Sequence, residues 1–125
     1  MNTSSTDIVF DIAEGRARFI VTFYIGKGYL NAGCDCPAGK YGNFCRHRIA
    51  LLRGDISQIA SKNHEELSQV LASLPGTRLD SALERFDACA SKVAELRERG
   101  PSDELSAAES EFKAARKNLS LMMMM

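Results

Sequence analysis

The sequence lacks a net charge, a long apolar run and a recognisable leader. No apolar stretch approaches the ~20 residues that a membrane-spanning helix needs, so no membrane contact is expected. The first residues carry neither a positive segment nor an apolar one, which argues against a signal peptide. A formally neutral chain does not coat nucleic acid by charge alone. We therefore expect a small cytoplasmic protein, in which cysteines stay reduced.

Cysteine and histidine are scarce, but most of them gather in one short segment. Cys34 and Cys36 are one residue apart, and after eight further residues Cys45 and His47 are again one residue apart. Incidental cysteines or a redox disulfide are the simpler interpretations. However, disulfide frameworks are typical of short secreted chains, and the redox motif C-x-x-C is absent. Three thiolates and one imidazole instead supply the closed tetrahedron that structural Zn²⁺ prefers.

The spacing within each pair predicts its local structure. Residues two apart on a strand point to the same face, so Cys34 and Cys36 reach one ion from an extended segment. Residues two apart within a helix do not face each other, so Cys45 is expected just before a helix and His47 in its first turn.

This pattern resembles the SWIM zinc finger over roughly residues 16–54. It consists of C-x-C and C-x-H pairs, with an apolar hairpin before them and the aliphatic run 49–52 after them. The resemblance implies one structural zinc held by Cys34, Cys36, Cys45 and His47 in a ββα unit. It also implies a module that binds DNA or other proteins, without naming the partner.

An apolar hairpin precedes the metal motif. Odd positions from 17 to 25 are all apolar, which predicts a half-buried strand over 16–25; a turn at 26–28 leads into a second strand over 29–36. The pattern of residues 7–13 fits either a strand or a helical turn. Because Leu30 and Ala32 share a face with the two cysteines, zinc binding should be coupled to folding.

The rest of the chain has helical periodicity. Asn63 followed by Glu66 predicts an N-cap and its capping partner for a helix ending near Leu74. Apolar residues then step by three and four over about 77–99 and 103–121, which predicts an antiparallel helical hairpin of coiled-coil type. This hairpin either packs on the zinc unit or forms an arm for a partner or a second copy, and its narrow seam favours an arm. We expect an α+β fold, with a zinc unit at residues 1–56 and a helical region at 57–125.

The zinc half is the basic half. Residues 15–53 hold seven Lys or Arg against Asp35 alone, whereas from residue 63 onward acidic residues outnumber basic ones. Tyr24, Tyr29 and Tyr41 could stack on bases. The candidate phosphate contacts are Arg16, Arg18, Lys27, Lys40, Arg46, Arg48 and Arg53. Such a modest patch predicts weak, salt-sensitive binding of DNA, as an accessory to a larger complex.

Two other classes of function compete with nucleic-acid binding. An enzyme is disfavoured, because four protein ligands leave no open zinc position and no H-x-E pair lies nearby; we expect no catalysis and no small-molecule substrate. A protein–protein interaction adaptor or regulator, encoded by a phage or mobile element, would use the helical hairpin without touching nucleic acid. The neutral net charge and the heptads favour this alternative.

Overall fold

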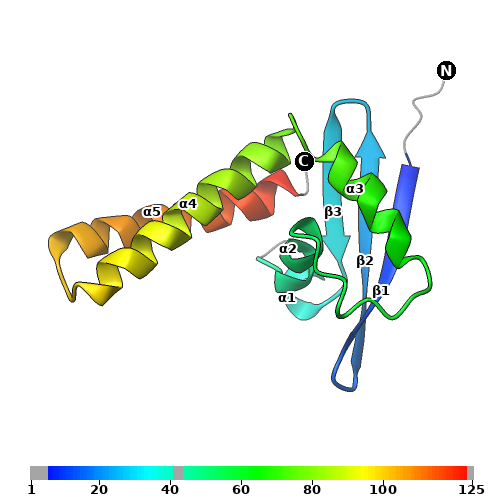
Figure 1. Ribbon diagram of the computed structural model, residues 1–125, viewed down its shortest axis with the longest axis horizontal. Helices are drawn as coiled ribbons and strands as arrows, with labels where there is room; N and C mark the ends of the chain where they lie inside the picture. The colour runs from blue at the N-terminus through cyan, green and yellow to red at the C-terminus, as the bar shows by residue number, and fades with distance from the viewer. Residues whose placement is uncertain (1–5, 41–43, 124–125) are drawn as a thin grey trace.

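Three antiparallel strands come first along the chain, and helical segments follow them (Figure 1). This computed structural model describes residues 6–40 and 44–123, apart from the side chain of Lys40. The fold is α+β, as the sequence predicts. Its elements are β1 (Thr6–Glu14), β2 (Ala17–Gly26), β3 (Tyr29–Cys34), α1 (Pro37–Lys40), α2 (Arg46–Leu52), the 3₁₀ turn η1 (His64–Glu66), α3 (Leu67–Ser73), α4 (Arg78–Glu98) and α5 (Asp103–Met122).

The sheet has the strand order β1-β2-β3. Phe10 of β1 lies opposite Val21 of β2, and Phe23 of β2 lies opposite Ala32 of β3, so alternate residues of all three strands share one apolar face. All four of these side chains are buried. The two strands predicted around the turn at 26–28 are confirmed. Residues 7–13, whose pattern fitted two structures, form a strand because they pair along β2.

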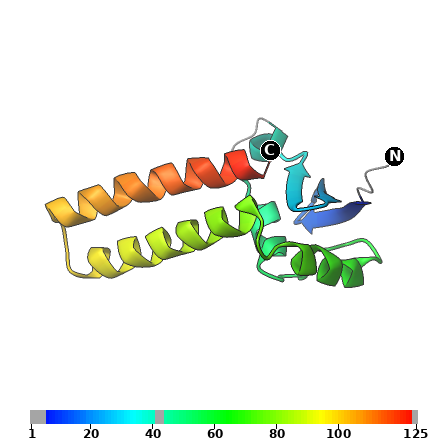
Figure 2. The same cartoon turned by 90° about the horizontal axis from the view of Figure 1, so that it is seen from above.

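Helices α2 and α3 cover the apolar face of the sheet. Ile49 and Leu52 of α2 and Leu67 and Val70 of α3 belong to the same buried cluster as the inward residues of the strands. Seen from above, α3 lies against one side of the sheet (Figure 2). Residues on both sides of the predicted boundary after residue 56 contribute to this cluster.

Irregular segments cover both edges of the sheet. Along β1, the backbone N–H of Ala60 donates to the carbonyl of Asp11, and the side chain of Asn63 donates to the carbonyl of Val9. Asn63 therefore does not act as the predicted helix cap: its amide is engaged on the strand, and its side chain makes no capping hydrogen bond. Covering an edge in this way blocks unwanted strand pairing.

The other edge binds the C-terminal tail, for which the sequence suggested no role. The N–H of Ala32 in β3 donates to the carbonyl of Met123 at 2.7 Å, and Met123 itself is buried in the main core. The carbonyl of Ala32 accepts a hydrogen bond from the guanidinium of Arg48. Met124 and Met125 lie outside the described residues. The tail thus ties the end of α5 to the sheet.

Helices α4 and α5 form the predicted antiparallel hairpin. The hydroxyls of Thr77 and Ser102 accept hydrogen bonds from backbone N–H groups three residues later, which fixes where each helix starts. The base of the hairpin shares the main core, whereas its far end has a separate apolar cluster of Val93, Leu96 and Ala108. The far end extends away from the sheet (Figure 1). No helix in the described part of the chain is both long and apolar enough to cross a membrane.

Candidate metal centre

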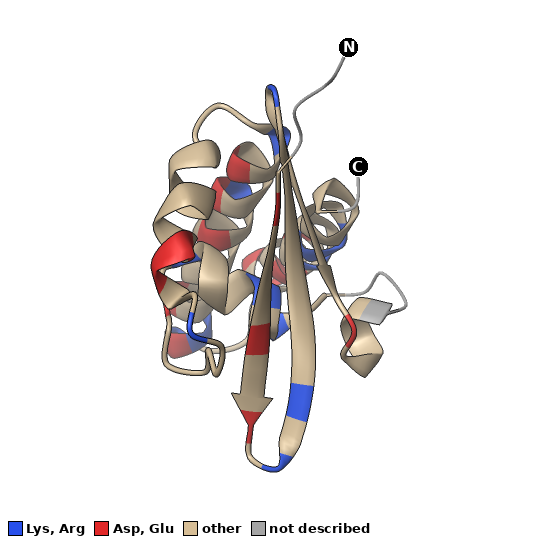
Figure 3. Cartoon of the chain, turned by 90° about the vertical axis from the view of Figure 1, so that its right-hand side faces the viewer, with Lys and Arg blue, Asp and Glu red and all other residues tan. Residues whose placement is uncertain are grey.

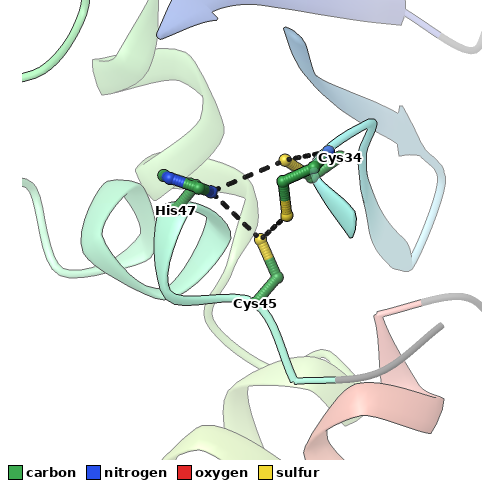
Figure 4. A group of neighbouring side chains, drawn as sticks. Cys34, Cys45 and His47 are labelled. Atoms are coloured by element: carbon green, nitrogen blue, oxygen red, sulfur yellow. Dashed lines mark hydrogen bonds between the residues drawn. The ribbon is translucent and has the colours of Figure 1, made fainter. Parts of the chain in front are cut away.

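The four predicted ligands meet where the sheet, the loop after it and helix α2 come together. Cys34 ends β3, Cys36 precedes α1, Cys45 is the N-cap residue of α2, and His47 lies in the first turn of that helix. Cys45 and His47 lie as their spacing predicted, whereas Cys36 is not on the strand predicted over 29–36, because the chain bends at Cys36 and turns into α1. All four residues are buried. Figure 4 shows Cys34, Cys45 and His47 pointing toward one another from these elements.

The distances between the four ligand atoms fit a tetrahedral zinc ion. All four atoms lie within 4.8 Å of one another. The Sγ atoms of Cys36 and Cys45 are 3.4 Å apart, and Nδ1 of His47 lies 3.9 Å from Sγ of Cys34 and 3.7 Å from Sγ of Cys45. Zinc bonds of ~2.3 Å to sulfur and ~2.0 Å to nitrogen would place tetrahedral ligands about 3.6–3.8 Å apart. The cysteines are unbridged here, and the 3.4 Å between Sγ of Cys36 and Sγ of Cys45 is longer than the ~2.05 Å of a disulfide bond.

The acid–base chemistry of the thiols also calls for a cation. The hydrogen bond between Cys45 and Cys34 is the main factor that lowers the pKa of Cys45 to about 4. The same contact, together with burial, raises the pKa of Cys34. Without a cation, the neighbouring thiols therefore hinder each other's ionisation. A bound Zn²⁺ removes this conflict, because a coordinating thiol is deprotonated outright. Three thiols and a buried imidazole thus fit zinc.

Backbone N–H groups support the sulfur atoms. The N–H of Cys36 donates to Sγ of Cys34 at 3.5 Å, and the N–H of Gly39 donates to Sγ of Cys36 at 3.3 Å. These donors stabilise thiolates, since hydrogen bonds to a charged form favour it. The single turn α1 is what brings the N–H of Gly39 over the ligand.

Glu14 orients the histidine ligand, and the sequence did not single it out. Its Oε2 atom lies 3.2 Å from Nε2 of His47, which leaves Nδ1 facing the sulfurs. The guanidinium of Arg46 binds the same carboxylate and, with His47, holds the pKa of Glu14 below its ordinary value. The ring of Phe19 packs on the imidazole at 4.9 Å between centroids. A carboxylate behind a ligating histidine is a common device for fixing its tautomer.

Replacing Gly39 with alanine should destabilise the zinc-loaded protein. A Cβ at Gly39 would lie 2.7 Å from the carbonyl oxygen of Cys34 and 2.8 Å from its Cβ, so the ligand strand and the turn would have to move apart. We expect a loss of about 1–3 kcal/mol in unfolding free energy, measured by urea denaturation of the zinc-loaded protein. Gly33→Ala is the matched control, because its Cβ would only touch the ring of Tyr24 at 3.8 Å. Equal stability of the two variants would contradict this account.

The basic residues predicted to contact nucleic acid do not form one surface. Arg16 and Arg18 are exposed at the β1–β2 end of the sheet, and Lys27 is exposed in the turn at the opposite end. Figure 3 shows basic positions at both ends of the sheet. Arg46 is paired with Glu14, and Arg53 with Asp87.

Arg48 and Lys40 differ from the other predicted phosphate contacts. Arg48 is fully buried, with its guanidinium donating to the carbonyl of Ala32, so its place among surface phosphate contacts is wrong. The side chain of Lys40 lies outside the described part of the structure, as does Tyr41.

Comparison with known proteins agrees with this geometry. No curated protein and no solved structure matches the chain. Residues 19–53, which run from β2 to the residue after α2, match the SWIM zinc finger family. Strand β1, with Glu14, and helices α3–α5 lie outside the matched segment. The chain therefore contains a SWIM zinc finger, in which Cys34, Cys36, Cys45 and His47 are positioned to bind one zinc ion.

Proposed function

We propose that this chain is a non-enzymatic module, held in shape by zinc, that binds nucleic acid. The observation that carries the proposal is a hollow of about 430 Å³ beside the metal centre. Arg46 and Arg116, from two different helices, line it together with described residues of the ligand-bearing loop, and the side chain of Arg46 stays 73% exposed although it pairs with Glu14. Guanidinium groups bind phosphate oxygens well, because their planar donors match phosphate geometry.

The metal centre supports a structural role for zinc. Four protein ligands complete the tetrahedron, whereas a catalytic zinc keeps a position open for water or substrate. Glu14 is the only carboxylate among the described residues that line the hollow, and it is already engaged by His47 and Arg46. A general base beside an open metal position is therefore missing from this part of the chain.

Phosphate contacts by a few arginines predict weak binding that falls steeply with salt. The test is fluorescence anisotropy of labelled single- and double-stranded oligonucleotides, titrated with zinc-loaded protein across a salt series. We expect saturable binding at low salt that weakens as salt is raised. Absence of binding to either oligonucleotide at low salt would refute the proposal.

A second candidate is a protein-interaction adaptor, which the helical hairpin favours. The far end of α4 and α5 extends from the sheet and carries its own apolar cluster. Size-exclusion chromatography with light scattering, together with the oligonucleotide titration, distinguishes an adaptor from a nucleic-acid-binding module. A dimer that forms without nucleic acid, in a protein that binds no oligonucleotide, would support the adaptor. A monomer with salt-sensitive oligonucleotide binding would support the first proposal.

A further inference from the structure

A second hollow continues the first one along helix α5. It has a volume of about 840 Å³ and shares Ala38, Phe44 and Arg116 with the hollow at the metal centre. Ala38 and Phe44 line one side, and residues of α5 from Ser110 to Leu121 line the other. Together the two hollows form one track, which we call the knuckle groove, from Arg46 to Leu121.

The charge of the knuckle groove along α5 has one sign. Lys113, Arg116 and Lys117 line it, all three are exposed, and no carboxylate lies among its described lining residues there. Lys113 and Lys117 are one helical turn apart, about 6 Å along the axis. The acidic residues of α5 lie in its first half, between Asp103 and Glu111. The helix therefore presents its cations next to the metal centre and its anions at the far end.

Part of the lining of the groove is apolar. Ala38, Phe44, Ala114 and Leu121 line it, and Leu121 is half exposed. The ring of Phe44 already stacks on Phe86 at 5.3 Å between centroids, and the guanidinium carbon of Arg116 lies 4.7 Å from its centroid. A nucleic-acid base in the groove would therefore contact aliphatic side chains rather than a free aromatic face.

We propose that the knuckle groove binds a single strand of nucleic acid, with α5 supplying the phosphate contacts. This inference rests on the proposed function and names its surface and its ligand. The cations of α5 would contact the phosphates along a nucleic-acid backbone. The apolar lining of the groove would contact unpaired bases, which a duplex keeps stacked in its interior. A major groove about 12 Å wide admits one helix, but here Ala38 and Phe44 lie across the hollow from the basic side of α5. The duplex is therefore the poorer occupant.

The test compares two variants that lose the same charge. Lys113→Gln with Lys117→Gln removes two cations from the groove, and Arg16→Gln with Arg18→Gln removes two from the β1–β2 end of the sheet. All four side chains are exposed, and glutamine keeps the helix propensity of lysine. Zinc content and circular dichroism confirm that both variants fold. The probes are a labelled single-stranded oligonucleotide and its duplex.

We expect the groove variant to bind the single strand roughly tenfold more weakly, and its salt slope to fall by about 1.4 because two phosphate contacts are lost. The sheet variant should change affinity less than threefold, and the duplex should bind more weakly than the single strand. Oligonucleotide binding that the groove variant leaves unchanged, or that favours the duplex, would overturn the groove while leaving the proposed function standing. Wild-type protein that binds neither probe would overturn both.

Discussion

Replacing Cys45 with serine is expected to abolish zinc binding and to unfold the sheet. Cys45 is 1 % exposed and belongs to the main apolar core, as do Cys34 and Cys36. A structural zinc contributes on the order of 10–16 kcal/mol, which is comparable with the whole stability of a small domain. Loss of one ligand therefore removes most of what holds the strands and α2 together.

The signature of this variant should be selective. Helices α4 and α5 carry their own caps and a separate cluster at their far end, so part of the helical signal should persist. Zinc content measured by atomic absorption should fall from one per chain to near zero, and the cooperative melt should disappear. Cys89→Ser is the matched control: Cys89 is half-buried in α4 and lies outside the group of ligand atoms. A Cys45→Ser protein with one zinc and a native melt would refute the ligand assignment.

Replacing Glu14 with alanine is expected to weaken zinc binding by 10- to 100-fold, although Glu14 does not touch the metal. Without its carboxylate, Nε2 of His47 loses the partner at 3.2 Å that sets the tautomer and keeps Nδ1 toward the sulfurs. The packing of Phe19 still contacts the ring but does not set its tautomer. Competition with a chromophoric chelator measures the change in affinity.

Two further variants separate positioning from the loss of an ion pair. Glu14→Gln keeps an oxygen that accepts from His47 but loses the charge, so its zinc affinity should lie between wild type and Glu14→Ala. Glu109→Ala removes the exposed pair with Arg97 on the hairpin, at 3.0 Å, and should leave zinc affinity unchanged. If Glu14→Ala retains wild-type zinc affinity, Glu14 has no positioning role.

The parts of the structure that the sequence predicted correctly are those set by local spacing. The two ligand pairs are each confined to three residues, so a strand for Cys34 and a helix start for His47 follow from backbone geometry alone. Cys36 lies two residues beyond the end of β3, because the chain bends there and enters α1 at Pro37. The hairpin α4–α5 follows in the same way from its helical periodicity and its break at Gly100.

The parts that the sequence did not reveal depend on contacts between distant residues. Glu14 reaches His47 across 33 positions, and that contact requires the register of β1 on β2. Burial of Arg48 requires the free edge of β3, where its guanidinium satisfies the carbonyl of Ala32; a basic residue is otherwise expected at the surface. The position of Met123 depends in the same way on β3, where the N–H of Ala32 donates to the carbonyl of Met123 at the end of α5.

The positive charge of the knuckle groove also depends on contacts between residues that are distant in the sequence. Counting charges assigned the basic character to the zinc half of the chain, because residues 15–53 hold seven Lys or Arg against Asp35 alone. In the folded protein, Arg48 is buried and Arg46 and Arg53 are paired, while Lys113 and Lys117 of an otherwise acidic region line the groove beside the metal centre. In the sequence, the only indication of this groove was the uneven charge along α5. That charge marks a groove only because α5 packs beside Ala38 and Phe44 in the folded protein.

The most direct test of the central claim is X-ray absorption spectroscopy at the zinc edge on the wild-type protein and on Cys89→Ser. The account predicts one zinc per chain in both proteins, with three sulfur ligands at about 2.3 Å and one nitrogen ligand at about 2.0 Å. A water oxygen in the coordination shell, or a sulfur ligand lost in Cys89→Ser, would contradict a closed site made by Cys34, Cys36, Cys45 and His47.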